Sequence, residues 1–113
     1  MALAKKHRLF KKDINRLFKR GKTVKNSFFF IRFLRNDANY LRTAVIVSTK
    51  IVKKATARNR IKRIFTEAIC SGHFLEKSYD IAIVATVSIV GKQSKEINRD
   101  LEQTLNKILG QSR

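Results

Sequence analysis

Hydrophobic side chains recur every three or four residues in three parts of this chain, the spacing that places them on one side of an α-helix. The first part, residues 11–20, carries Ile14, Leu17 and Phe18 and ends before Gly21. The apolar positions of the other two parts are Ile61, Ile64, Phe65, Ala68 and Ile69, and Ile97, Leu101, Leu105 and Ile108. The pattern therefore predicts three amphipathic helices, the last with Ser94 as its N-cap.

Between the helices, aromatic and β-branched residues gather in short runs that predict β-strands. Residues 27–34 (SFFFIRFL) and 42–48 (RTAVIVS) are separated by the turn-prone RNDANY, so we expect an antiparallel hairpin. Residues 79–87 are apolar on both faces, as in a strand between two layers, and a further short strand is expected near residues 23–25. These elements predict an α+β fold, a small sheet covered by helices, and leave its strand order open.

Positive charge is concentrated in the first part of the chain. The sequence has 26 Lys and Arg against 8 Asp and Glu, a formal net charge of +18. Residues 1–63 hold 20 of these cations and 2 of the acids, whereas residues 64–113 hold 6 of each. Such a chain repels itself unless a polyanion is present, so nucleic acid is the expected partner class. A solvated basic surface without a partner is the alternative.

The length of 113 residues predicts one domain, residues 1–113, with a basic N-terminal arm at about residues 1–10. The single cysteine, Cys70, and the absence of a cleavable leader favour a cytoplasmic protein. The longest apolar run, residues 81–90, is too short to cross a bilayer, so no membrane partner is expected.

Catalytic and metal-binding arrangements are absent from the sequence pattern. His7 and His73 have no neighbouring Ser, Cys or acid in a recognisable arrangement, and both are expected at the surface. One Cys and two distant His do not make a zinc site. We therefore expect no catalytic residue, no metal ligand and no small-molecule substrate.

The second helix begins with an unfavourable charge. Its start, RNRIKR, carries four cations in residues 58–63, although each cation near a helix N-terminus costs roughly 0.3 to 1 kcal/mol. Core packing explains none of these residues, because the apolar face lies elsewhere on the helix. An anionic partner such as phosphate would reverse the cost, and Lys50, Lys53 and Lys54 extend the same patch. The alternative is again a solvated basic face.

Aromatic and basic residues alternate in the run 28–33. Alternation places Phe28, Phe30 and Arg32 on one face of a strand, and Phe29, Ile31 and Phe33 on the other. If helices cover only one face, Phe30 beside Arg32 is suited to stacking unpaired bases and meeting phosphates. The alternative is that both faces are core.

The stretch KIVKKATARNRIKRIFTEA, residues 50–68, closely resembles the signature of the bacterial ribonuclease P protein subunit. The resemblance extends to RLFKKDINRLFKRG, RTAVIVSTK and YDIAIVA, and so covers nearly the whole chain. It implies a small α-β sandwich in the order αβββαβα, with a left-handed βαβ crossover, whereas most such crossovers are right-handed.

The resemblance also implies a function. Proteins of this family bind a large catalytic RNA, and the ribonucleoprotein removes the 5′ leader of precursor tRNA by hydrolysis that requires Mg²⁺. The RNA is the catalyst, so this chain would be an accessory subunit of an endoribonuclease with no cofactor of its own. A ribosomal or other structural RNA-binding protein, and a protein nuclease acting without RNA, are the alternatives.

Residue roles follow from the same resemblance. The catalytic-RNA contacts would be Arg58, Asn59, Arg60, Lys62 and Arg63, supported by Lys50, Lys53 and Lys54. The leader cleft, between the first helix and the sheet, would include Phe18, Phe30, Arg32, Ile46 and Ser48. Further basic contacts are expected at Arg8, Lys11, Lys12 and Arg16. Ile14 stands where the family usually has Phe, Arg32 where an aromatic residue is common, and Thr86-Val87 where a basic residue often occurs, so leader contacts are expected to be more ionic and less stacked.

Overall fold

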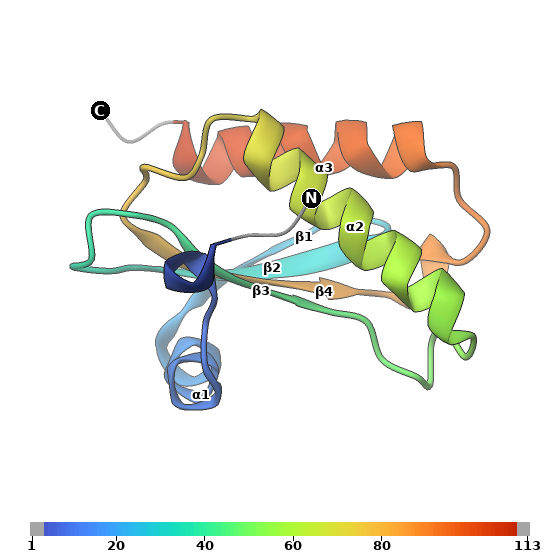
Figure 1. Ribbon diagram of the computed structural model, residues 1–113, viewed down its shortest axis with the longest axis horizontal. Helices are drawn as coiled ribbons and strands as arrows, with labels where there is room; N and C mark the ends of the chain where they lie inside the picture. The colour runs from blue at the N-terminus through green and yellow to red at the C-terminus, as the bar shows by residue number, and fades with distance from the viewer. Residues whose placement is uncertain (1–3, 111–113) are drawn as a thin grey trace.

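A four-stranded sheet separates one helix from the two others (Figure 1). The structure is a computed structural model that describes residues 4–110. The helices are α1 (Lys11–Arg20), α2 (Ala55–Ser71) and α3 (Ser94–Leu109), with two short 3-10 turns, η1 (Lys5–His7) and η2 (Val87–Ile89). The strands are β1 (Lys22–Lys25), β2 (Phe29–Arg35), β3 (Arg42–Ile46) and β4 (Tyr79–Ala85). The α+β sandwich and the αβββαβα order are confirmed, including the short first strand.

The predicted hairpin of the second and third strands is wrong. The strand order is β1-β2-β4-β3, so β4 lies between β2 and β3. It pairs antiparallel with β2 and parallel with β3. The link after β2 passes the start of β4, where the Asn36 amide donates to the carbonyl of Ser78 at 2.9 Å. β4 is the strand with apolar side chains on both faces, and burial favours the central position for it.

The connection from β3 through α2 to β4 joins two neighbouring parallel strands. Its path is left-handed (Figure 1), the rare hand for such a crossover. After a loop, α2 starts near the edge of the sheet at which the parallel strands β3 and β4 both end (Figure 1).

The two faces of the sheet are covered to different extents. The main core lies between the sheet and the two helices α2 and α3. It includes all the apolar positions predicted for these two helices, together with Phe29, Ile31 and Ile83. The other face has a small cluster in which Leu17 of α1 packs with Leu9 and Ala82. α1 runs across the strands rather than along them, so it covers only part of this face (Figure 1).

Two local predictions are wrong. His7 is buried, not exposed, because the chain before α1 packs beside β3 and His7 Nδ1 lies 2.6 Å from the Leu41 carbonyl oxygen. Ser94 is the first residue of α3 rather than its cap, and its hydroxyl instead accepts a hydrogen bond from Arg60 at 3.1 Å. Within residues 4–110, no helix has the length and apolar content needed to cross a bilayer.

Candidate nucleic-acid interface

The sheet face that carries α1 consists of three rows of side chains, set by the strand register. The row beneath α1 contains Thr23, Arg32, Ala82 and Ala44. On one side of it lies the row Lys25, Phe30, Val84 and Ile46, and on the other the row Leu34, Asp80 and Arg42. α1 therefore divides this face into two regions, one apolar and one charged.

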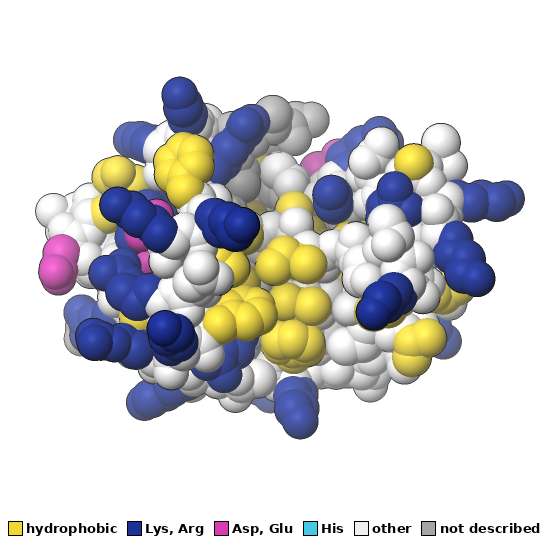
Figure 2. Space-filling model, turned by 90° about the horizontal axis from the view of Figure 1, so that it is seen from below, with side chains coloured by type: hydrophobic (Ala, Val, Ile, Leu, Met, Phe, Trp, Pro, Cys, Tyr) yellow, Lys and Arg dark blue, Asp and Glu magenta, His cyan; other side chains and the backbone are white. Residues whose placement is uncertain are grey.

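The apolar region is the predicted cleft. Phe30, Ile46 and Val84 are half-buried, and they belong to neither apolar cluster of the core. Phe18 of α1 borders them with 42% of its surface exposed. Figure 2 shows this face with a central apolar patch between two groups of Lys and Arg side chains. Unpaired bases could stack on such a patch while flanking cations meet their phosphates.

Phe28 does not belong to this cleft, although simple alternation placed it beside Phe30. It precedes β2 and is 7% exposed, in the main core. Its amide N–H makes no strand hydrogen bond, because it donates to the side-chain oxygen of Asn26 at 2.9 Å in the turn before β2. Alternation holds only from Phe29 onward, so the prediction that Phe28 shares the Phe30 face is wrong.

Arg32 lies in the cleft wall and binds α1. Its guanidinium donates to the carbonyl oxygens of Leu17 and Phe18 and, at 2.7 Å, to the hydroxyl of Thr23. It also lies over the Phe18 ring, 5.7 Å from the ring centre. These carbonyls belong to the last turn of α1, where the helix dipole attracts a cation. Arg32 therefore holds Phe18 against the sheet.

Gly21 allows this close approach. A Cβ atom at this position would lie 2.6 Å from the Leu17 carbonyl oxygen and 3.0 Å from that of Phe33. Both distances are too short for a side chain, so α1 can end directly against β2 only with glycine here.

Ser48 follows β3 and shapes the basic loop. Its hydroxyl accepts from the Lys50 amide at 3.1 Å, and its carbonyl accepts from Ile51 and Val52. Val52 is buried and anchors the loop, whereas Lys50, Lys53 and Lys54 are exposed. The three predicted lysines thus lie on a turn that leads directly into α2.

The start of α2 has no acidic residue in its first turn and no side-chain cap. Arg58 donates to the carbonyls of Val52 and Lys53, at 3.1 and 2.8 Å, and thereby closes the basic loop onto the helix. Arg60 donates to Ser94 and, at 3.4 Å, to the Lys92 carbonyl, so it joins α2 to the segment before α3. Asn59 and Arg63 are exposed, and Lys62 is half-buried. The structure thus brings all eight residues predicted to meet catalytic RNA onto one loop and helix start.

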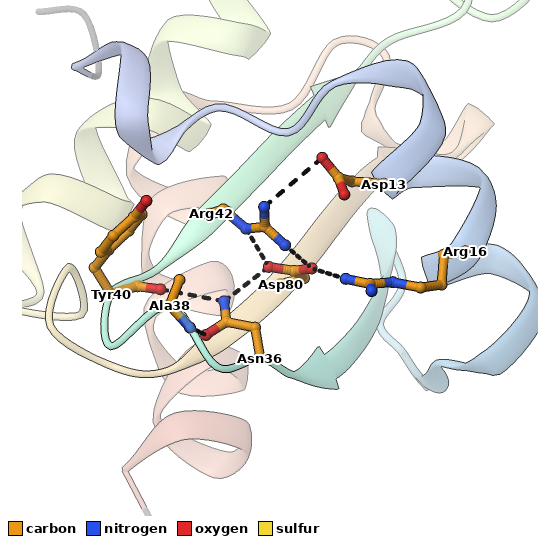
Figure 3. Close-up of polar contacts among 7 residues, drawn as sticks. All are labelled: Asp13, Arg16, Asn36, Ala38, Tyr40, Arg42 and Asp80. Atoms are coloured by element: carbon orange, nitrogen blue, oxygen red, sulfur yellow. Dashed lines mark hydrogen bonds and ion pairs between the residues drawn. The ribbon is translucent and has the colours of Figure 1, made fainter.

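A buried carboxylate beside α1 was missed in the sequence. Asp80 is 1% exposed and accepts two hydrogen bonds from Arg42, at 2.9 and 2.8 Å, and one from Asn36 at 2.8 Å (Figure 3). Arg16 of α1 reaches the same carboxylate at 3.4 Å, and Asp13 lies 3.7 Å from Arg42. The hydrogen bonds that Arg42 donates to Asp80 raise the pKa of Arg42 above its usual value, which favours the charged guanidinium. The available signal was a lone acid within the apolar strand YDIAIVA.

Four predicted basic contacts lie near the N-terminus. Arg8, Lys11, Lys12 and Arg16 are exposed, and only Arg16 has an ion pair among the described residues. Arg8 forms an isolated parallel β-bridge with Thr43, so the segment before α1 runs alongside β3. His73 is exposed, as expected. Within residues 4–110, no three His, Cys, Asp or Glu side chains come together as a metal site.

The fold and these surfaces define a small basic α-β protein with an apolar cleft and a cation-rich helix start. The family model for ribonuclease P matches residues 3–109, and the chain belongs to this family. The ribonuclease P protein component of Legionella pneumophila (strain Corby) is 33% identical over 108 residues, covering 95% of this chain and 93% of that protein.

Solved structures of the family are similar. The Thermotoga maritima RNase P protein matches with a TM-score of 0.76 and 27% identity, covering 85% of this chain and 91% of that one. A Staphylococcus aureus RNase P protein mutant with defective mRNA degradation activity matches with a TM-score of 0.82 and 28% identity, covering 92% of this chain and 89% of that one.

Proposed function

We propose that this chain is the RNA-binding subunit of ribonuclease P, and that it binds both the catalytic RNA and the 5′ leader of precursor tRNA. The observation that carries the proposal is the pairing of two different surfaces at one side of the molecule. One is an apolar cleft open to solvent, and the other is a helix start that carries only positive charge in its first turn. A protein that binds a single RNA would need only one of these two surfaces.

The α2 start and its basic loop are suited to the catalytic RNA. Helix N-termini and basic side chains both attract phosphates, and folded RNA presents a dense backbone. Asn59 and Arg63 point to solvent, while Arg58 and Arg60 fix the loop and the helix by hydrogen bonds. The positions of the donors are therefore set before RNA binds, which lowers the cost of binding.

The cleft is suited to the single-stranded leader. Phe18 and Phe30 offer exposed ring surface for stacking, worth about 1 to 3 kcal/mol per base. Ile46 widens the apolar floor on the β3 side, and Ser48 lies where the floor meets the basic loop. A single-stranded leader in the cleft would thus lie beside the catalytic RNA bound at the start of α2.

Hydrolysis is assigned to the catalytic RNA with Mg²⁺, in agreement with the resemblance. The described acids do not form a cluster suited to Mg²⁺, and the buried carboxylate of Asp80 already accepts from Arg42, Asn36 and Arg16. We therefore assign no chemical step to a metal held by this chain. Its residues bind and position RNA, as expected for a cytoplasmic accessory subunit.

The leader proposal is tested by comparing two substrates. The affinity of the reconstituted ribonucleoprotein is measured for precursor tRNA with a leader of several nucleotides and for the mature tRNA. We expect the protein to increase affinity for the precursor and to leave that for mature tRNA nearly unchanged. Equal effects on both tRNAs would overturn the leader site.

A second candidate function is suggested by the Staphylococcus aureus relative, whose mutant is described as defective in mRNA degradation. By similarity, this chain could contact mRNA through the same cleft. Among the described residues, neither histidine is hydrogen-bonded to a Ser, Thr or Cys side chain, and we keep subunit function as our conclusion. Incubating the RNA-free protein with mRNA tests this alternative.

A further inference from the structure

The side of α1 that faces away from the cleft carries a second basic hollow. Leu17 points into the sheet, and the helical spacing then places Phe18 on the cleft side and Arg16 and Arg20 on the opposite side. This opposite side faces the row that contains Leu34, Asp80 and Arg42. α1 thus separates the hollow from the leader cleft.

Four arginines from three segments line this hollow, which has a volume of about 540 Å³. We name it the outer arginine pocket and define it by Arg16 and Arg20 of α1, Arg35 at the end of β2 and Arg42 of β3. Asp13 and Asp37 also line it. Two adjoining hollows share Arg20 and add Lys12, Lys19 and Lys22.

The charges of the pocket are only partly compensated. Asp80 and Asp13 bind Arg42, and Asp80 also reaches Arg16, whose side chain is 50% exposed. Arg20 and Arg35 are exposed and make no ion pair within residues 4–110. Seven cations line the three hollows together, against the carboxylates of Asp13 and Asp37 in their lining and of the buried Asp80 that binds Arg16 and Arg42. Such a concentration repels itself unless an anion binds.

The wall of the pocket is fixed. Asn36 donates to Asp80 and to the Tyr40 carbonyl, at 2.8 and 3.2 Å, and accepts from the Ala38 amide at 3.0 Å (Figure 3). Arg42 is held by two hydrogen bonds to the same carboxylate. An anion entering the pocket therefore has to order only the exposed arginines.

Guanidinium groups suit phosphate, because their planar donors match its oxygens. Small-molecule sites are mostly apolar, whereas this hollow is lined mainly by charged residues. The position behind α1 keeps a strand in the leader cleft away from it. A wall fixed before binding suits the partner that the subunit holds permanently, which is the catalytic RNA rather than the substrate.

We propose that the outer arginine pocket binds backbone phosphates of the catalytic RNA, at a site separate from the start of α2. The proposal rests on the function proposed above. It adds a second anchor, so that α1 is held between the leader on one side and the catalytic RNA on the other.

The test uses Arg20→Ala, Arg35→Ala and the double variant, with Arg99→Ala as the control. Arg99 lies on α3, on the opposite side of the sheet, with a side chain that is 65% exposed. Binding of each full-length protein to ribonuclease P RNA, without tRNA, is measured over a series of salt concentrations. We expect each pocket variant to lower affinity about tenfold and to reduce the salt slope by about one, while the control changes neither.

Unchanged affinity and slope in the double variant would overturn the proposal, provided that thermal unfolding shows the variant to be folded. The titration is repeated with mature tRNA present, and a loss of affinity that appears only in this second titration would also overturn the proposal, because the pocket would then serve the substrate. Arg63→Ala is measured in the same titration. If it loses affinity while the pocket variants do not, the pocket fails and the RNA-binding function of α2 stands.

Discussion

Arg32 of β2 donates to the Phe18 carbonyl and at the same time lies over the Phe18 ring, 5.7 Å from its centre. One guanidinium thus contacts both the backbone and the side chain of the residue that borders the cleft. Two residues earlier in α1, on the other side of the helix, Arg16 reaches the buried Asp80. α1 is therefore fixed to the sheet at two points, and its position sets the width of the cleft.

This relationship predicts that Arg32 acts mainly by positioning Phe18. Arg32→Met, which removes the charge and keeps an apolar stem, should weaken precursor tRNA binding by the reconstituted ribonucleoprotein. The salt dependence of binding should stay nearly the same, because few phosphate contacts are lost. A salt slope lower by about one would show instead that Arg32 meets a leader phosphate.

A double-mutant cycle separates the two roles further. If Arg32 acts through Phe18, the losses caused by Arg32→Met and Phe18→Ala should not add, with a coupling of about 0.5 to 3 kcal/mol. Arg32→Lys should restore part of the affinity, since a cation would again face the last turn of α1. Full additivity would contradict a positioning role.

Phe29 and Phe30 are neighbours on opposite faces of β2 and make a matched pair. Phe29 is fully buried in the main core, so Phe29→Ala should cost about 3 to 5 kcal/mol of unfolding free energy. Phe30 is half-buried outside both clusters, and Phe30→Ala should cost about 1 kcal/mol. Denaturant unfolding measures both.

The same pair should differ in RNA binding. Phe30→Ala should lower affinity for precursor tRNA by about 1 to 3 kcal/mol and leave mature tRNA unaffected. If Phe30→Ala is as unstable as Phe29→Ala and weakens the binding of precursor and mature tRNA equally, Phe30 is a core residue and the cleft assignment is wrong.

Arg63 and Arg60 should separate RNA binding from stability. Arg63 is exposed without a hydrogen bond among the described residues, so Arg63→Ala should reduce affinity for the catalytic RNA and lower the salt slope by about one. Its unfolding free energy should change by less than about 0.5 kcal/mol. Arg60→Ala should weaken RNA binding too, but also lose about 1 kcal/mol of stability with its bonds to Ser94 and Lys92. Unchanged RNA binding in both variants would return this patch to a solvated basic face.

The buried carboxylate predicts unequal effects for its two arginines. Arg42→Met leaves Asp80 without the two hydrogen bonds that Arg42 donates to it and should cost about 3 to 5 kcal/mol, because a buried charge loses its partner. Arg16→Met removes a longer contact from a half-exposed side chain and should cost less than about 1 kcal/mol. Urea unfolding at neutral pH compares them, and equal small losses would show that Asp80 is stabilised mainly by Asn36.

The helices could be predicted from the sequence because their apolar spacing is local. The pairing of the strands could not, since the partner that separates β2 from β3 comes later in the chain. The apolar faces of residues 79–87 did indicate a buried strand, but not which neighbours it would have. His7 shows the same limit: its basic neighbours suggested exposure, whereas the Leu41 carbonyl that contacts it is distant in sequence.

The candidate site could be predicted as far as charge and alternation define it. The basic start of α2 and the Phe30 face of β2 were both visible in the sequence. The contacts of Arg32 and Asp80 depend on where α1 crosses the sheet, which no local pattern specifies. For that reason the outer arginine pocket emerged only from the structure, whereas the family resemblance had already implied a cleft between the first helix and the sheet.

The most direct test of the account is a reconstitution with precursor tRNA at low Mg²⁺. Three mixtures are compared: the protein alone, a ribonuclease P RNA alone, and both together, with the length of the released leader as the readout. We predict that the protein alone leaves precursor tRNA intact, and that the mixture removes the leader at a Mg²⁺ concentration at which the RNA alone is slow. Mg²⁺-dependent removal of the leader by protein rigorously freed of RNA, or no gain from adding the protein to the RNA, would contradict it.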